Sequence, residues 1–279
     1  MTTGTLSPIP QGDQIRALER RAWLDMFDGA PPDVRSEFEM TCQSSEAAAY
    51  LASAGLHGVP FNRAFGVEPT WALAPQVARG GIDWLRRHAA EGWVVQVDEA
   101  DIPATGSFLR RQGLSQLETG WMKLVLAACP IAPRAQLDVS VVQDEEDAYA
   151  FADVIIDGFG FPTGTRDWFA GLAGRKSWHA YLVRSEEYAC AAGAAFVTED
   201  GAWLGLDATL QDYRGLGMQR ALIERRVSDA FTSGAPFAIA ETGRPGQGNQ
   251  RQDASYRNYL RCGFAVSHYS ANFGSIGAK

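Results

Sequence analysis

The residues with the clearest potential for chemistry form a glycine-containing turn at Arg214-Gly215-Leu216-Gly217. An apolar segment precedes the turn and apolar residues at helical spacing follow it, so the turn joins a strand to a helix. Glycine lacks a Cβ atom, which lets a phosphate-bearing ligand approach the backbone closely. The first N–H groups of a helix have no partners within the helix, and the helix dipole adds partial positive charge there. The pattern therefore predicts a diphosphate site where this helix begins.

Two common phosphate-binding patterns do not fit this turn. The pattern G-x-x-x-x-G-K-[ST] fails because no Lys-Ser/Thr pair follows, and G-x-G-x-x-G fails because Arg220 stands at its third glycine position. An ordinary tight turn that opens a helix is the alternative interpretation of this segment taken alone. The helix that follows is predicted to pack on a sheet through Leu216, Ile223, Val227 and Ala230, which share one face at helical spacing.

A second motif, Ser255 to Phe264, ends in Tyr259-Leu260-Arg261-Cys262-Gly263-Phe264. The two motifs, in this order and with room for a helix, a strand and a loop between them, resemble the signatures of the GNAT superfamily of N-acetyltransferases. The first signature, [QR]-x-x-G-x-[GA], corresponds to Arg214 through Gln219, and the second is a short helix ending in Tyr-x-x-x-Gly-Phe. Gln219 departs from the small residue that is usual at the last position of the first signature. The resemblance covers residues 137 to 273.

The resemblance implies an acyltransferase that moves an acetyl group from acetyl-CoA to a primary amine by direct transfer, without a metal. In this superfamily the pantetheine lies between two parallel strands that splay apart, and the turn wraps the diphosphate. An asparagine in the later loop often contacts CoA. The acyl-CoA-binding residues implied in this way are Asp207, Ala208, Thr209, Arg214, Gly215, Leu216, Gly217, Met218, Gln219, Arg220 and Asn249.

The resemblance also implies catalytic residues. Tyr259 matches the tyrosine that acts as a general acid toward the CoA thiolate, and a phenol with an ordinary pKa near ~10 can supply that proton. Glu241, at the end of a predicted strand, is the first candidate for the general base, and Asp207 on the neighbouring strand is the second. The competing interpretations are a tyrosine that packs its helix onto the sheet and carboxylates that are merely solvated.

Three aromatic residues, Phe161, Trp168 and Phe169, fall where the family places the wall of the acceptor site. They are therefore candidates for substrate binding, and ordinary packing of an amphipathic helix is the competing interpretation. The acceptor itself, a small-molecule amine or a peptide, stays open.

Composition limits the class of protein. The 279 residues include no apolar run of the ~18 to 20 residues that a membrane helix needs, and the N-terminus lacks the features of a signal peptide. The four cysteines form no C-x-x-C pair and the four histidines are dispersed, so reduced thiols and no metal site are expected. A net charge of −8 argues against a nucleic-acid partner. We expect a cytoplasmic protein without a membrane partner, and homo-oligomers stay open.

The elements indicate an α/β fold with a mixed sheet and two parts. Residues 137–279 are expected to form the acetyl-CoA-binding GNAT domain, in which Ala191 to Ala195 keep one strand thin so that helices pack closely over it. Residues 129–136, with two prolines, are the predicted linker. In residues 1–128 we expect helices at 13–27, 45–54, 75–90 and 103–112, and strands at 36–41, 59–67, 93–97 and 120–126.

This order of strands and helices resembles a GNAT half, but no [QR]-x-x-G-x-[GA] turn occurs in it. We therefore expect a smaller, diverged GNAT-like N-terminal domain that has lost its CoA site; the alternative is that its strands extend one larger sheet. Two functional alternatives also stay open: a CoA-binding regulatory or sensor protein without transferase activity, and a tandem-GNAT enzyme that transfers aminoacyl or longer acyl groups.

Overall fold

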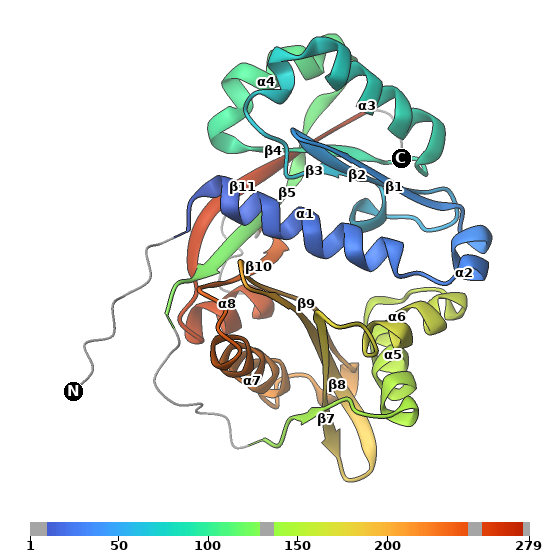
Figure 1. Ribbon diagram of the computed structural model, residues 1–279, viewed down its shortest axis with the longest axis vertical. Coiled ribbons are helices and arrows are strands. Elements are labelled where there is room, and N and C mark those ends of the chain that lie inside the picture. Colours follow the sequence, from blue (N-terminus) through green and yellow to red (C-terminus); the bar gives the residue numbers. More distant parts are fainter. Residues whose placement is uncertain (1–9, 129–136, 245–252, 276–279) are drawn as a thin grey trace. The chain divides into compact units, whose positions relative to one another are not determined.

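The computed structural model describes residues 10–128, 137–244 and 253–275 of the chain (Figure 1). They divide into two compact units. The N-terminal unit contains Gly12–Lys123 and His268–Lys279, and the C-terminal unit contains Met1–Gln11 and Leu124–Ser267. This division groups residues 268–279 with the N-terminal unit, which no sequence pattern indicated. The predicted linker at residues 129–136 lies outside the described residues.

The N-terminal unit combines a sheet in the strand order β1-β2-β3-β4-β11-β5 with four α-helices among its described residues. Its elements are α1 (Gly12–Asp28), α2 (Pro32–Glu37), β1 (Met40–Ser45), β2 (Ala48–Ser53), β3 (Arg63–Phe65), α3 (Pro75–His88), β4 (Val94–Asp98), α4 (Ile102–Arg111), β5 (Ser115–Leu126) and the end of β11 (Ala265–Gly274). The predicted helices at 13–27, 75–90 and 103–112 are confirmed as α1, α3 and α4. Helix α3 packs through Ala78, Ile82 and Leu85, whose spacing places them on one face.

The predicted helix at residues 45–54 is wrong. This segment belongs to the hairpin of β1 and β2, which pair antiparallel from Met40↔Ser53 to Ser45↔Ala48. All six residues of β2 are buried, so the strand is covered on both faces and shows no alternation. Alanine and leucine favour helices when they are considered locally, and packing inside the sheet overrides that preference. The strand predicted at 36–41 is also shifted, since α2 ends at Glu37 and β1 begins at Met40.

The last strand, β11, contributes its final residues to the N-terminal unit. It pairs antiparallel with β4, from Ser270↔Asp98 to Phe273↔Val95, so strands far apart in the sequence lie side by side (Figure 1). Ala271 and Phe273 join the buried cluster that contains Val95, Val97 and residues of α3 and α4. The C-terminal end of the chain thereby completes the core of the N-terminal unit.

The C-terminal unit has a sheet in the strand order β10-β9-β8-β7-β6. Its elements are β6 (Ser140–Val141), α5 (Glu145–Phe159), α6 (Arg166–Leu172), β7 (Trp178–Ser185), β8 (Tyr188–Thr198), β9 (Gly201–Thr209), α7 (Met218–Thr232), β10 (Ala238–Gly243), α8 (Ala254–Arg261) and the beginning of β11. Helix α5 begins at the N-cap Asp144, whose side chain accepts a hydrogen bond from the Asp147 N–H at 2.9 Å. Strands β7 and β8 pair antiparallel as a hairpin, from Trp178↔Phe196 to Ser185↔Tyr188.

Small residues let helix α5 lie close to this sheet. A Cβ added at Gly158 of α5 would lie 2.6 Å from the Cβ of Ala208 on β9. On α7, Ile223, Val227 and Ala230 are buried as expected. The prediction that Leu216 is buried on the same face is wrong, since Leu216 is 60% exposed. It lies in the turn before α7 and is not part of the helix.

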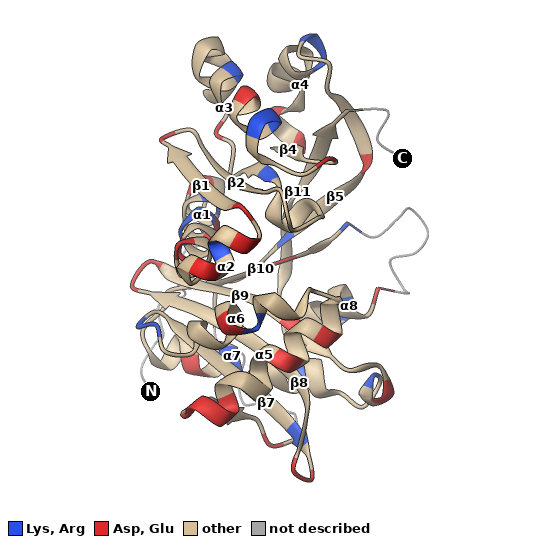
Figure 2. Ribbon diagram, turned by 90° about the vertical axis from the view of Figure 1, so that its right-hand side faces the viewer, with Lys and Arg blue, Asp and Glu red and all other residues tan. Residues whose placement is uncertain are grey.

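Charged residues are distributed over both units. Figure 2 shows both acidic and basic residues in each of the two units. The net charge of −8 is therefore not carried by one unit alone. Within the described ranges, no helix combines the length and the hydropathy that crossing a bilayer requires.

Candidate active site

The turn between β9 and α7 has the backbone that its glycines suggested. Gly215 has φ 84° and Gly217 has φ 86°, in the left-handed region that only glycine adopts at little cost. A Cβ at either position would meet nothing within 4 Å, so conformation rather than crowding requires glycine here. Arg214 holds the turn against the end of β9 through a hydrogen bond from its Nε to the Thr209 carbonyl at 3.2 Å. The residues from Arg214 to Gly217 are all exposed.

Helix α7 begins at Met218 with Gly217 as its N-cap, and no side chain caps it. The first backbone bond back into the turn runs from the Ala221 N–H to the Gly217 carbonyl at 3.1 Å. Because the N–H groups of a first helical turn have no carbonyl partners within the helix, those of Met218, Gln219 and Arg220 are available for an anion. The beginning of α7 thus has the properties of a diphosphate site.

Gln219, the departure from the first signature, has its own role. Its Nε2 donates to the Ser255 hydroxyl at 3.1 Å, and its Oε1 accepts from the Asn258 Nδ2 at 2.9 Å. Both partners lie on α8, so the amide side chain connects α7 to α8. Because the side chain is engaged there, the larger residue does not fill the exposed turn.

Strands β9 and β10 pair over a short distance and then part. Their parallel pairing runs from Ala238↔Ala202 to Ala240↔Leu204, and among the described residues no further pair follows. On the other side of β9, the register with β8 shifts between Ala192↔Ala208 and Ala194↔Gly205. Leu206 within this bulge has φ 54°, a left-handed conformation that is uncommon for a residue with a side chain. The bulge begins where the two parallel strands part, and the backbone of residues 207–209 follows it.

Two buried side chains, Tyr259 and Arg226, meet the half-buried Asp207 beside this bulge. The Tyr259 hydroxyl on α8 donates to Oδ2 of Asp207 at 2.6 Å, and Oδ1 of Asp207 pairs with the Arg226 guanidinium on α7. Tyr259 is 1% exposed and Arg226 is 0% exposed. Burial raises the pKa of Tyr259 well above its ordinary value, the Asp207 charge raises it further, and Arg226 opposes both effects. In this arrangement Tyr259 holds its proton, and both oxygens of Asp207 are engaged.

The other candidate residues lie at the end of β10 and beyond it. Glu241 is half-buried and follows Ala240, the last residue of β10 that pairs with β9. Of the two carboxylates predicted as base, Glu241 thus lies past the end of the paired region and Asp207 lies in the bulge. Asn249, predicted to contact CoA, lies outside the described residues. The described chain contains no group of three His, Cys, Asp or Glu side chains arranged to hold a metal ion.

The three aromatic candidates for the acceptor site form a continuous stack. The ring of Phe161 lies 5.6 Å from that of Phe169, which lies 4.8 Å from that of Trp168. Trp168 and Phe169 are both fully buried, so they pack α6 against its neighbours, whereas Phe161 is half-buried. The stack continues through Phe159, 5.2 Å from Phe161 and 47% exposed. The stack is therefore buried at Trp168 and most exposed at Phe159.

Sequence reasoning missed two of these residues. Phe159 is the last residue of α5, and its side chain is 47% exposed. Arg226 lies one helical turn after Leu222, on the face of α7 that packs on the sheet, where an apolar residue is usual. The signal available in the sequence was Gly193 within the Ala191–Ala195 run: a Cβ at Gly193 would lie 2.9 Å from the Arg226 Cζ.

Comparisons with known proteins agree with this architecture. The structure is similar to a GCN5-related N-acetyltransferase from Kribbella flavida, with a TM-score of 0.64, 15% identity, and coverage of 97% of this chain and 98% of that one. It is similar to a GCN5-related N-acetyltransferase from Sphaerobacter thermophilus, with a TM-score of 0.60, 16% identity, and coverage of 95% and 93%. A tandem GNAT protein from the clavulanic acid biosynthesis pathway matches with a TM-score of 0.55, 13% identity, and coverage of 95% and 96%.

No protein-family model matches the sequence, and no curated protein matches it. At these identities the structural similarity establishes the fold. The predicted fold class is confirmed: the chain has a GNAT fold in its C-terminal half, preceded by a smaller GNAT-like α/β part.

Proposed function

We propose that this chain, which has the GNAT fold, is an acyltransferase that binds acetyl-CoA in its C-terminal unit and transfers the acetyl group directly to a primary amine. The observation that carries the proposal is the combination of two left-handed glycines at the beginning of α7 with the parting of β9 from β10. The first feature suits a diphosphate. The second leaves strand-edge backbone groups near Asp207 to Thr209 for the amide groups of a pantetheine.

The proposed reaction breaks the thioester C–S bond and forms a C–N bond to the amine. The amine must lose a proton, and the thiolate of CoA must gain one. Glu241, which follows the last residue of β10 that pairs with β9, is the proposed base, and Asp207, which bonds Arg226 and Tyr259, is the second candidate. Tyr259 is the proposed acid, and its hydroxyl must exchange its bond to Asp207 for one to the departing sulfur.

The test of acyl-CoA binding is calorimetric titration with acetyl-CoA of the wild-type protein and two glycine variants. Gly217→Glu places a negative side chain at the proposed diphosphate site. Gly234→Glu is the matched control, because Gly234 has φ 92°, has open space around it and lies just after the other end of α7. Both variants carry the same backbone strain and the same added charge. We expect micromolar binding that Gly217→Glu abolishes and Gly234→Glu preserves; no wild-type binding, or equal binding by all three proteins, contradicts the proposal.

A second candidate is a CoA-binding regulatory protein without transferase activity. The observation that favours it is the buried hydrogen bond from Tyr259 to Asp207, which occupies the proposed acid. Assay of thiol release from acetyl-CoA over a panel of primary amines, small molecules and peptides included, separates the two. Release that depends on the amine supports the enzyme, whereas tight binding without release across the panel supports the regulatory protein.

A further inference from the structure

Arg226 is a permanent cation in the interior of the C-terminal unit. It is 0% exposed, whereas its neighbour Arg225 has 39% of its side chain exposed. Removing a charged group from water is costly unless other groups replace its hydration. A completely buried arginine therefore needs an arrangement of acceptors around it.

The acceptors come from three elements. The Nη1 atom of Arg226 donates to the Ala194 carbonyl on β8 at 2.9 Å and to the Gly205 carbonyl on β9 at 3.1 Å. Its Nε donates to the Leu222 carbonyl on α7 at 3.1 Å, and its Nη2 pairs with Asp207. The planar guanidinium, with five N–H donors in fixed directions, can satisfy such a set, and a lysine cannot.

These acceptors border the β9 bulge. The register between β8 and β9 breaks immediately after Ala194↔Gly205, and Asp207 lies within the break. Arg226 therefore binds the last paired carbonyls before the break and the carboxylate inside it. Gly193, on the opposite strand, leaves the space in which the guanidinium lies. Arg226, which lies on α7, therefore holds the bulge through these bonds.

We propose that Arg226 is a positioning residue of the acyl-CoA site: it fixes the β9 bulge from which residues 207–209 extend and, through Asp207, fixes the hydroxyl of Tyr259. The inference rests on the proposed function. It assigns to Arg226 the coupling of two parts of the site, the strand backbone for the pantetheine and the acid for the thiolate. The strand backbone belongs to β9, and Tyr259 belongs to α8. Arg226 connects them, because it bonds the Gly205 carbonyl and the Asp207 carboxylate of β9, and Asp207 accepts from Tyr259.

The first test needs no ligand. The charged groups that face Tyr259 are Asp207 on β9 and Arg226 on α7. In Asp207→Asn the carboxylate charge is removed while Arg226 remains, so Tyr259 should ionise at a lower pH than in the wild type. Spectrophotometric titration should therefore show tyrosinate forming at a lower pH in Asp207→Asn than in the wild type, and the double variant Asp207→Asn/Tyr259→Phe should lack this difference. Titration curves of Asp207→Asn that coincide with those of the wild type overturn the inference.

The second test measures binding. Arg226→Lys retains the positive charge but cannot hold the bulge carbonyls and Asp207 together, so we expect the Kd for acetyl-CoA to rise about tenfold or more, since small misplacements in a site have large effects. Arg225→Lys is the matched control, because Arg225 bonds Asp229 and the Val139 carbonyl, away from the bulge. Equal Kd values for the two variants, with both folded by circular dichroism, overturn the inference.

The two tests separate this inference from the proposed function. If the wild-type protein does not bind acetyl-CoA, the proposed function fails, while the tyrosinate titration still decides whether the Asp207 carboxylate holds the Tyr259 hydroxyl. If the wild-type protein binds acetyl-CoA and Arg226→Lys binds it equally well, the positioning role fails and the function stands. The titration tests the contact between Asp207 and Tyr259, and the Kd comparison tests the hold of Arg226 on the bulge.

Discussion

The Tyr259 hydroxyl donates to Asp207 Oδ2 at 2.6 Å across 52 residues of sequence. The contact connects the short helix α8 to the bulge of β9, and the ring of Tyr259 also meets Phe264 edge-on at 5.0 Å between centroids. The hydroxyl and the ring thus have separate partners. Tyr259→Phe can therefore remove the proton donor without removing the packing of the ring.

For Tyr259→Phe we expect turnover to fall by about 10²-fold, in the range that general acid catalysis contributes, while the Kd for acetyl-CoA stays unchanged. The measurement is kcat by thiol release together with calorimetric Kd. Tyr181→Phe is the control, because Tyr181 is also buried and also donates to an aspartate, Asp229, at 3.1 Å. Equal kcat values in the wild type and Tyr259→Phe would remove Tyr259 from the reaction.

Glu241→Gln should lower kcat with little change in acetyl-CoA binding, because a neutral amide of the same shape cannot accept the proton of the amine. A loss of about 10²-fold or more is expected for a general base. Glu187→Gln, in the exposed hairpin turn between β7 and β8, is the control for the loss of one carboxylate. If Glu241→Gln retains wild-type kcat over the whole pH profile, another group accepts the proton.

Phe161 and Phe169 should respond differently to truncation, although both were predicted as substrate-binding residues. Phe169 is fully buried, so Phe169→Ala should lower the free energy of unfolding by about 3–5 kcal/mol. Phe161 is half-buried next to the exposed Phe159, so Phe161→Ala should cost less stability and raise KM for the amine. Denaturant unfolding and initial-rate kinetics measure the two effects. A KM for the amine that Phe161→Ala leaves unchanged would remove this residue from the acceptor site.

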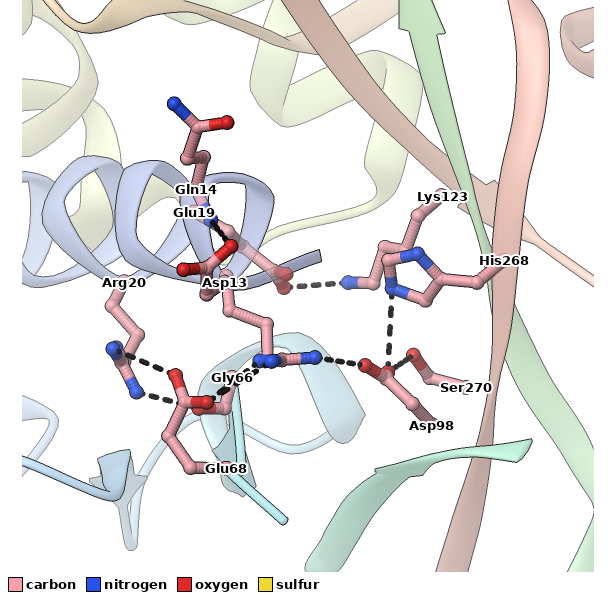
Figure 3. Close-up of polar contacts among 11 residues, drawn as sticks. Asp13, Gln14, Glu19, Arg20, Gly66, Glu68, Asp98, Lys123, His268 and Ser270 are labelled. Carbon is pink, nitrogen blue, oxygen red and sulfur yellow. Dashed lines mark hydrogen bonds and ion pairs between the residues drawn. The ribbon is translucent and has the colours of Figure 1, made fainter. Parts of the chain in front are cut away.

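In the N-terminal unit, Asp98 should make folding sensitive to acid. Its carboxylate accepts a hydrogen bond from Arg16 at 2.9 Å. It also accepts one from Ser270 at 2.6 Å, and His268 lies 3.4 Å away (Figure 3). Burial alone would raise the pKa of Asp98, but the hydrogen bond and charge of His268, the Ser270 bond and the charge of Lys123 together lower it well below its ordinary value.

A lowered pKa in the folded state means that the carboxylate stabilises the fold above the unfolded-state pKa of ~3.9, and that this stabilisation is lost as the pH falls toward the folded-state value. We expect the unfolding free energy of the wild type to decrease below about pH 4, and Asp98→Asn to show a smaller decrease. Urea unfolding between pH 7 and pH 2 tests this. Parallel pH profiles for the two proteins would show that Asp98 does not contribute to the acid sensitivity.

The sequence determined the local features of the candidate site. The glycines at 215 and 217, the helix after them, and the short helix ending at Arg261 follow from backbone preferences and from spacing within a few residues. Such features depend on neighbours along the chain, so a single sequence contains the information. The two motifs also indicated the fold, because each occurs in a fixed place between the same elements.

The tertiary structure decided which distant residues meet. Periodicity identifies the buried face of α7 but does not name its partner, so the contact of Arg226 with Asp207 and the bulge was not predictable. The same limit applies to β2, whose alanines favour a helix locally and lie in a strand covered on both faces, and to β11, which pairs with β4 far back in the chain. Strand pairing and the burial of charge depend on contacts between segments far apart in sequence, and these form only when the whole sheet is assembled.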